Sequence, residues 1–410
     1  MAPEPAPDDT HRLPRGAIAS LALAAFASGL SMRVNDALLP RLAGEFGVSL
    51  GSAAQVISLF AIAYGLAQLG FGPFGDRFGK YRVIGWASAA CALTALACAL
   101  APGFDALRLA RVLAGATAAA IIPLAMAWIG DVVPYEQRQP LLARFLIGQI
   151  LGLTAGVWLG GIAADHLTWR VPYVMIAALF AVTSAVVLTL DARLPERARG
   201  RHAAGGPVLQ RLLGEFAGVL SRPWARIVLA LVFLEGMFLY GPFAFIASHV
   251  HQAFGLSLAA SGAVVMLFGL GGFVFAVLSG RLVRGLGEVG LARWGGAAMG
   301  LALLAIAFAP SWPWAMLACF MLGLGFYMLH NTLQVNATQM APERRGAAVA
   351  AFASCFFLGQ SAGVSLGGAG IAWLGTTGLL AAGAAGVLSV GLTFSAAIGR
   401  ARSATPPPRD

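Results

Sequence analysis

Gly72-Pro-Phe-Gly-Asp-Arg-Phe-Gly-Lys-Tyr-Arg82 is a short, charged stretch, broken by glycines, that separates two long apolar runs. The runs cover residues 53–71 and 83–101. Each has about the length that a helix needs to cross a hydrocarbon core of ~30 Å. The stretch therefore predicts a tight turn between two membrane-spanning helices. Its basic residues alone would suit an ordinary cytoplasmic turn, where Lys and Arg are in excess.

The composition is that of a polytopic membrane protein. Of the 410 residues, 59% are hydrophobic and 11% are charged, whereas a soluble domain has about 25% charged residues. The mean hydropathy is +0.80. The net charge of +10 does not indicate a nucleic-acid partner, because the arginines lie in loops between apolar runs and form no continuous basic face. The four cysteines all lie in apolar runs and lack metal-ligand spacing.

The apolar runs predict twelve spans, and the basic residues predict how they are oriented. The spans cover residues 17–39, 53–73, 83–101, 106–129, 141–164, 172–190, 226–248, 260–282, 291–310, 313–336, 346–372 and 377–399. Of the 27 Lys and Arg residues, 22 fall in one set of loops and tails, 3 fall in the other set, and Arg33 and Arg111 fall within spans. Because basic residues are in excess on the cytoplasmic side, both termini are predicted to be cytoplasmic.

The chain divides into two similar halves. Gly280-Arg-Leu-Val-Arg-Gly-Leu-Gly287 follows the Gly72–Gly79 stretch by 208 residues, and Pro342-Glu-Arg-Arg345 follows Pro134-Tyr-Glu-Gln-Arg138 by the same offset. We therefore predict six-helix bundles over 17–190 and 226–400, joined by an arginine-rich cytoplasmic linker over 191–225. Residues 208–220 of the linker have the spacing of a surface helix. Residues 1–16 and 401–410 are predicted to be cytoplasmic tails, and residues 1–16 lack a signal-peptide pattern.

The order Gly72-x-x-x-Asp76-Arg77-x-Gly79-Lys80-x-Arg82 and the repeat resemble major facilitator superfamily transporters, in the drug–proton antiporter and sugar-efflux branch. The resemblance covers nearly the whole chain. It implies an all-α membrane protein with twelve transmembrane helices in two pseudo-symmetric six-helix bundles, and a substrate site between them. It also implies a monomer in a bacterial inner membrane. In the family this aspartate is thought to latch the two halves on the cytoplasmic side.

Two further motifs carry the resemblance. Arg111-x-x-x-Gly115 is similar to a fourth-helix motif of the family, and a charge within a span is a functional hypothesis by default. An arginine that extends to the outer interface is the alternative. In the fifth span, Gly148, Gly152, Gly156, Gly160 and Gly161 resemble the antiporter motif of the exporters. Val157 stands where those exporters have proline, so plain helix packing through small residues is an equal alternative.

Two acidic residues, Asp36 and Glu235, lie within the predicted spans. Asp36 is placed for an ion pair with Arg33, three residues earlier, and its segment resembles a first-helix Asp-x-x-x-Pro motif of efflux transporters. Glu235 lies near the middle of its span, where apolar surroundings favour a neutral carboxyl. Both are candidates for proton coupling, with His330 as a third. The alternatives are a structural ion pair for Asp36, a hydrogen bond between helices for Glu235, and a satisfied buried histidine for His330.

Polar residues elsewhere in the spans are predicted to line a cavity or to bridge helices. Those considered for the cavity are Gln68, Gln149, Tyr240, Tyr327, Asn331 and Gln360. No cofactor or metal site and no catalytic motif is expected. The sequence thus predicts a transporter that exchanges protons for a small molecule, a drug-like compound or a sugar. A nutrient importer of the same fold and a membrane sensor that does not transport are the alternatives.

Overall fold

A computed structural model describes residues 16–200 and 208–403, so the tails and Gly205 in the middle of the linker lie outside the described residues. Every element in these ranges is helical. The helices are α1 (Ala17–Arg33), α2 (Leu39–Phe46), α3 (Leu50–Ala53), α4 (Gln55–Phe78), α5 (Lys80–Ala99), α6 (Phe104–Ala118), α7 (Ile121–Val132), α8 (Tyr135–His166), α9 (Val171–Asp191), α10 (Glu196–Arg199), α11 (Val208–Leu220), α12 (Pro223–Phe243), α13 (Ile246–Phe254), α14 (Leu258–Ala307), α15 (Trp312–Gln339) and α16 (Arg345–Ser403), with a 3-10 turn over Pro342–Arg344.

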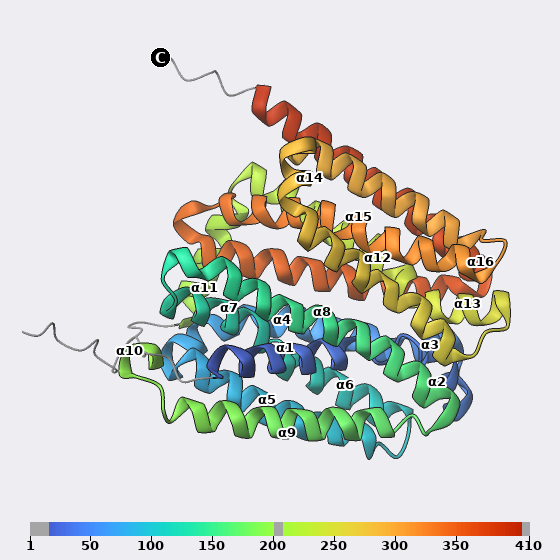
Figure 1. Ribbon diagram of the computed structural model, residues 1–410, viewed down its shortest axis with the longest axis horizontal. Helices are drawn as coiled ribbons and strands as arrows, with labels where there is room; N and C mark the ends of the chain where they lie inside the picture. Colours follow the sequence, from blue (N-terminus) through green and yellow to red (C-terminus); the bar gives the residue numbers. More distant parts are fainter. Residues whose placement is uncertain (1–15, 201–207, 404–410) are drawn as a thin grey trace, which may run out of the picture.

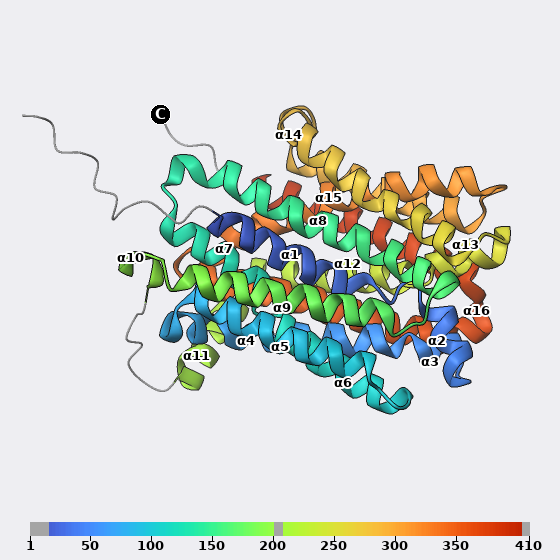
Figure 2. The same cartoon turned by 60° about the horizontal axis from the view of Figure 1, so that its bottom comes forward.

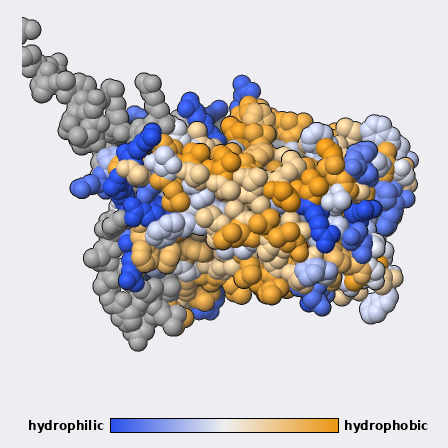
Figure 3. All heavy atoms as spheres, turned by 90° about the horizontal axis from the view of Figure 1, so that it is seen from below, coloured by the Kyte–Doolittle hydropathy of each residue, from blue (hydrophilic) through white to orange (hydrophobic). Residues whose placement is uncertain are grey.

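The surface of the molecule is suited to a bilayer. Within the described residues, nine helical stretches are long and apolar enough to cross a membrane. Two of them are very long: Leu258–Ala307 has 50 residues and Pro342–Ala401 has 60. On the face shown in Figure 3, an apolar band crosses the middle of the molecule, and hydrophilic side chains gather toward its two ends. Large apolar side chains such as Leu93, Val277 and Leu301 are more than 60% exposed.

Glycines with positive φ break the long helices at tight turns. The predicted turn between α4 and α5 lies at Gly79, whose φ is 92°. Gly287 follows Gly79 by the 208-residue offset of the repeat, and it breaks α14 with φ 61°. Gly375 breaks α16 with φ 62°. Only glycine adopts this backbone conformation without steric cost, so the two copies of the stretch end in the same kind of turn.

Some of the predicted spans are interrupted in the structure, and the one predicted over 226–248 is divided into α12 and α13. The span predicted over 17–39 ends as a helix at Arg33 and continues as a turn, in which Asp36 N–H donates to the Arg33 carbonyl at 3.2 Å. Asn and Asp side chains compete for backbone hydrogen bonds, and Pro40 cannot continue a helix from the preceding turn, so the break falls here. The span predicted over 106–129 is divided into α6 and α7.

The helices gather in two groups that lie side by side (Figures 1 and 2). Two large clusters of buried apolar side chains correspond to them: one draws mainly on residues 17–198 and the other mainly on residues 219–398. We call these groups the N-half and the C-half. They meet where α4 packs against α16 and α8 packs against α14.

The two ends of the helices differ. One end carries the Gly79 turn, α10, α11 and the start of α16, and we call it the turn end; the other carries α2, α3, α13 and the break at Gly375, and we call it the opposite end (Figure 1). At the turn end, Arg82 pairs with Asp191 at 2.8 Å, and Arg344 donates to the Gly214 carbonyl of α11 at 2.9 Å.

Candidate functional site

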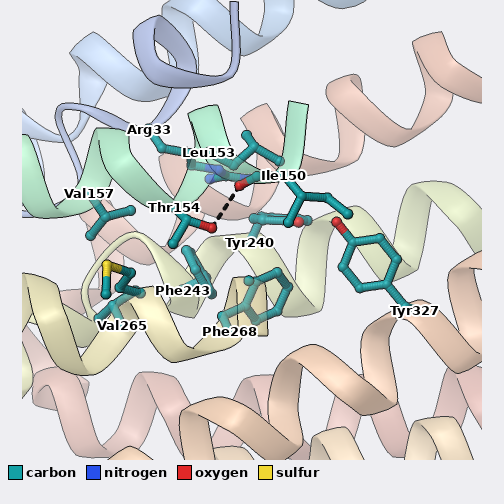
Figure 4. A pocket seen from close by; sticks show the side chains of 12 residues that line it. Arg33, Ile150, Leu153, Thr154, Val157, Tyr240, Phe243, Val265, Phe268 and Tyr327 are labelled. Carbon is teal, nitrogen blue, oxygen red and sulfur yellow. Dashed lines mark hydrogen bonds between the residues drawn. The ribbon is translucent and has the colours of Figure 1, made fainter. Parts of the chain in front are cut away.

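A small cavity lies between the N-half and the C-half, and both contribute to its walls (Figure 4). The N-half side is lined by residues of α1 and α8: Arg33, Ile150, Leu153, Thr154 and Val157. The C-half side is lined by residues of α12, α14 and α15: Tyr240, Phe243, Val265, Met266, Phe268, Gly269 and Tyr327. The cavity measures about 20 Å³, roughly the space of one water. A drug-sized ligand needs on the order of 300 Å³ or more, so it fits only after the walls separate.

Arg33 joins the two halves at this cavity. Its guanidinium lies 4.0 Å from the centre of the Tyr240 ring and 5.2 Å from that of Phe243, both on α12. Its Nη1 also forms an ion pair with Asp36 Oδ2 at 3.5 Å. Arg33 is 4% exposed. A cation over aromatic faces in dry surroundings is attracted by about 2 kcal/mol, so this contact helps to hold the N-half against the C-half.

Asp36 lies in the turn after α1 and is 1% exposed. Among the described residues, neither of its carboxylate oxygens has a hydrogen-bond partner. Its neighbour Asn35 accepts a 2.5 Å hydrogen bond from the Tyr173 hydroxyl of α9, which fixes the turn. The structure therefore gives the predicted Arg33–Asp36 ion pair, and it places this pair beside the cavity rather than at the end of the molecule.

Arg111 is held inside the N-half. Its Nε donates to the Val56 carbonyl at 3.0 Å, its Nη1 donates to the Ser31 carbonyl at 3.2 Å, and its guanidinium lies 4.2 Å from the Phe60 ring centre. It is 1% exposed, so the alternative of an arginine that extends to the interface is wrong. Gly115 lets α6 approach α4, because a Cβ there would lie 2.2 Å from the Phe60 carbonyl oxygen.

Glu235, which is buried, and His330, which is partly buried, form a second pair, in the C-half. His330 Nδ1 lies 2.7 Å from Glu235 Oε2, which joins α15 to α12. Glu235 is fully buried. The imidazole is surrounded by Phe326, Phe352 and Phe356, with ring centroids 4.7–5.4 Å away. Both residues were singled out in the sequence, but their pairing was not predicted.

The turn motif lies at the turn end, away from the cavity. Lys80 bridges two carboxylates: Asp76 at 2.9 Å and Asp131 of α7 at 2.7 Å. Asp76 is thus paired within the N-half. Arg77 is exposed, and Gly72 has open space where a Cβ would stand.

The glycines of the fifth predicted span lie on α8 and are packing positions in this structure. A Cβ on Gly152, Gly156 or Gly160 would lie 2.0–2.7 Å from a backbone carbonyl oxygen of α1 or of the turn that follows it. Such distances require a glycine, because the opposing atom is backbone. Gly161 faces the C-half instead, and its Cβ would lie 2.4 Å from the Leu258 carbonyl oxygen.

The halves are in close contact at the opposite end. Asp165, at the end of α8, accepts hydrogen bonds from the Leu258 and Ala259 N–H groups at the start of α14, at 3.1 and 2.6 Å. A Cβ on Gly51 would lie 2.0 Å from the Gly368 carbonyl oxygen. Sequence inspection missed Asp165 because it lies at the end of a predicted span, among loop residues. Helix N-terminal N–H groups attract a carboxylate.

The contacts between α4 and α16 continue as far as the middle of the molecule. The Ser361 hydroxyl donates to the Ser58 carbonyl at 2.9 Å, and the Tyr64 and Phe357 rings lie 4.2 Å apart. Gly65 faces residues 354–358 of α16. Gly70 and Gly72, nearer the turn end, have open space where a Cβ would stand.

The remaining polar candidates divide between cavity and packing. Of the six residues considered for the cavity, Tyr240 and Tyr327 are among its lining residues, and Gln68, Gln149, Asn331 and Gln360 are not. Thr154 and the Phe243–Phe268 pair were missed, because a threonine and phenylalanines in an apolar run carry no sequence signal that separates a cavity wall from a core. In the part of the chain that the structure describes, no group of His, Cys, Asp and Glu is placed to hold a metal ion.

Comparison with known proteins gives a family and a fold. A family model described as Major Facilitator Superfamily matches residues 21–364. The MFS-type transporter YceJ of Bacillus subtilis (strain 168) is 25% identical over 350 residues, which are 84% of this chain and 86% of that protein. The multidrug export protein EmrB of Escherichia coli (strain K12) is 27% identical over 191 residues, 46% of this chain and 37% of EmrB.

A solved structure has the same architecture. The crystal structure of a mutant of the nucleoside transporter NupG matches with a TM-score of 0.77 over 93% of this chain and 99% of that chain. The two sequences are 15% identical, so the likeness concerns the fold alone.

Proposed function

The chain belongs to the major facilitator superfamily, and we propose that it is a proton-coupled efflux transporter for a small molecule, either a drug-like compound or a sugar. It is a multi-pass membrane transporter rather than an enzyme. The direction of transport is argued from the relatives, which include the multidrug export protein EmrB. The bilayer of a bacterial inner membrane is the proposed site, and a single chain is the proposed working unit.

The proposal includes twelve spans. The nine apolar stretches contain two that are each long enough to cross twice, and α1 adds a shorter apolar helix. The breaks at Gly287 and Gly375 divide the two long stretches. Each break adds one span to the nine stretches, and α1 adds a third, which gives twelve spans. The linker over 191–225 would join them as two sets of six.

The proposed orientation in the membrane determines toward which side the cavity is closed in this structure. If the turn end is cytoplasmic, as its arginines predict, then the close contacts at Asp165, Gly51 and Gly161 lie on the outer side. The cavity is then closed toward the outside. Asp76 is paired with Lys80 in this state, which agrees with a latch that engages only when the cavity faces outward.

The observation that carries the coupling proposal is the Arg33–Asp36 pair at the junction of the halves. Asp36 is buried, and its partner Arg33 also contacts Tyr240 of the C-half. A movement of one half against the other would therefore change the surroundings of the Asp36 carboxyl. As the halves rock, the pair can be broken and remade, and Asp36 can accept and release a proton. The Glu235–His330 pair is the second proposed carrier. Inward proton movement supplies ~2.3 kcal/mol per charge per 100 mV.

Proton movement in everted vesicles tests this proposal, with a substrate taken from a resistance and uptake screen of a knockout strain. In vesicles with an acidic lumen, adding substrate should release luminal protons. Asp36→Asn or Glu235→Gln should abolish this release while substrate still binds. Asp105→Asn is the matched control, because Asp105 is 92% exposed and paired only with its helical neighbour Arg108.

The alternatives give different results in the same assay. A nutrient importer that carries a proton with its substrate would move protons into the lumen when substrate is added outside. A sensor would show binding and no proton movement. If both variants keep full gradient-driven transport, neither carboxyl carries the proton.

A further inference from the structure

The cavity between the halves presents a positive charge and no negative one. Arg33 is the one charged residue among the cavity's lining residues, and Asp36 lies behind it. In Figure 4 the Arg33 side chain enters from α1 and its nitrogens lie above the Tyr240 ring, facing the aromatic side chains of the C-half. A ligand in the cavity would therefore meet a guanidinium first.

Arg33 has hydrogen-bonding capacity that its present contacts do not use. A guanidinium carries five N–H donors, yet Nη1 of this 4% exposed residue has no hydrogen-bond partner within the described part of the chain. The contact of Nη1 with Asp36 is an ion pair at 3.5 Å, and the guanidinium also lies over the Tyr240 ring. The fork of a guanidinium matches the two oxygens of a carboxylate.

The wall opposite Arg33 is aromatic. Phe243 and Phe268 lie with ring centroids 4.9 Å apart, and Tyr327 lies 6.4 Å from Phe268. Because these rings belong to the C-half and Arg33 to the N-half, separating the halves widens the space between the charge and the rings. Aromatic faces and edges accept another flat ring in offset or edge-on packing.

We propose that this cavity takes aromatic organic anions: the carboxylate of the substrate binds Arg33, and its ring packs among Phe243, Phe268 and Tyr327. The inference rests on the proposed function, transport through this cavity, and it narrows the substrate class. An aromatic cation is disfavoured, because Arg33 already lies over the Tyr240 face and would repel a second positive charge.

Three probes of one shape test the charge preference. They are 2-naphthoate, the uncharged 2-naphthamide and the cation of 2-(aminomethyl)naphthalene, each titrated onto the full chain in lipid nanodiscs and followed by probe fluorescence. Naphthoate is expected to bind at least about tenfold more tightly than the amide, as a charge-assisted bidentate contact requires. The cation is expected to bind most weakly.

Two substitutions should change the affinity for naphthoate in opposite directions. Misfolding would lower the affinity in both variants, so it can be told apart from a change in the charge of the site. Arg33→Gln should remove the preference for naphthoate over the amide and leave amide binding within about twofold, because the aromatic wall is intact. Asp36→Asn should tighten naphthoate binding, because it removes the anion that competes for Arg33. Arg108→Gln is the matched control: Arg108 also lies near a ring, Phe104, but away from the cavity, and it should change nothing.

The outcomes distinguish this inference from the proposed function. Equal binding of the three probes, preference for the amide or the cation, or no binding of naphthoate would overturn the anion class, while proton-coupled transport of another substrate would still support the function. Selective naphthoate binding that Arg33→Gln abolishes, together with no proton-coupled flux, would support the anion site and contradict the transport mechanism.

Discussion

At the scale of single residues, each half has a buried carboxyl paired with a basic side chain: Asp36 with Arg33, and Glu235 with the partly buried His330. Arg33–Asp36 lies at the junction of the halves, whereas Glu235–His330 lies within the C-half. Taking such groups out of water is costly, and an unpaired one costs most. Their burial therefore indicates a task beyond stability, and their different places indicate different tasks.

The Glu235–His330 contact should appear as an energetic coupling. His330→Ala leaves Glu235 buried without a partner, which costs about 1–3 kcal/mol. Glu235→Gln should cost less, because the amide keeps an acceptor for His330. A double-mutant cycle on the free energy of unfolding in detergent should then give a coupling of about 0.5–3 kcal/mol. Additivity of the two substitutions would show that the carboxyl of Glu235 contributes no more to the 2.7 Å contact than an amide does.

At the scale of helices, glycines decide which surfaces come together. Gly148, Gly152, Gly156 and Gly160 of α8 face α1 or the turn after it within the N-half, whereas Gly51 and Gly161 face the C-half at the opposite end. A substitution in the first group should therefore weaken one half, and a substitution in the second should move the halves apart. The first effect is measured as a lower melting temperature, and the second as a longer distance between labels on the two halves.

Gly51→Ala should open the contact between the halves at the opposite end. The added Cβ would lie 2.0 Å from the Gly368 carbonyl oxygen, and backbone cannot give way as a side chain does. Overpacking of this kind costs about 1–3 kcal/mol, which favours the state that is open at this end. Distances between spin labels at Arg41→Cys and Trp373→Cys, on exposed positions of the two halves, should lengthen.

Two other glycines serve as controls for this measurement. Gly152→Ala would place a Cβ 2.1 Å from the Phe26 carbonyl oxygen inside the N-half, so it should lower the melting temperature without lengthening the label distance. Gly44→Ala meets open space and should change neither. An unchanged distance in Gly51→Ala would contradict the assignment of Gly51 as an interface position.

The sequence predicted the elements better than their contacts. Apolar length and glycine-rich turns placed most spans, and the repeat predicted a turn near Gly287. Helices that are apolar all round carry no amphipathic pattern, so nothing in the sequence told which face of α12 or α15 points inward. The Glu235–His330 pair, 95 residues apart, and the Asp165 contact with α14 could therefore not be foreseen. Arg33–Asp36 was predictable because its partners are three residues apart.

At the scale of the whole molecule, the two ends hold the halves together differently. At the opposite end the halves are joined at Asp165 and Gly51, and toward the middle by the Ser361–Ser58 hydrogen bond. At the turn end, the two ion pairs of Lys80 lie within the N-half, and the ion pair between Arg222 and Glu343 lies within the C-half. The proposed rocking of the halves exchanges one set of contacts for the other, so under this proposal the turn end needs contacts that form only in the second state.

Asp76 is the residue that we expect to supply such a contact. In the structure it is bound to Lys80, while α16 begins at Arg345 on the C-half at the same end. Once the turn end closes, the carboxylate is expected to face the N-terminus of α16, where a negative charge gains about 0.3–1 kcal/mol. Losing that energy in one state alone shifts the balance of the two states by about two- to fivefold.

Asp76→Asn should therefore lower the turnover of the reconstituted transporter by about two- to fivefold and leave substrate affinity nearly unchanged. Asp131→Asn is the matched control, because Asp131 shares Lys80 with Asp76 but belongs to α7 of the same half. It removes the other ion pair of Lys80 and leaves Asp76, the proposed latch, unchanged, so its turnover should stay near normal. Equal loss in both variants would assign the effect to Lys80 and the local fold. Normal turnover in Asp76→Asn would show that the turn end closes without this carboxylate.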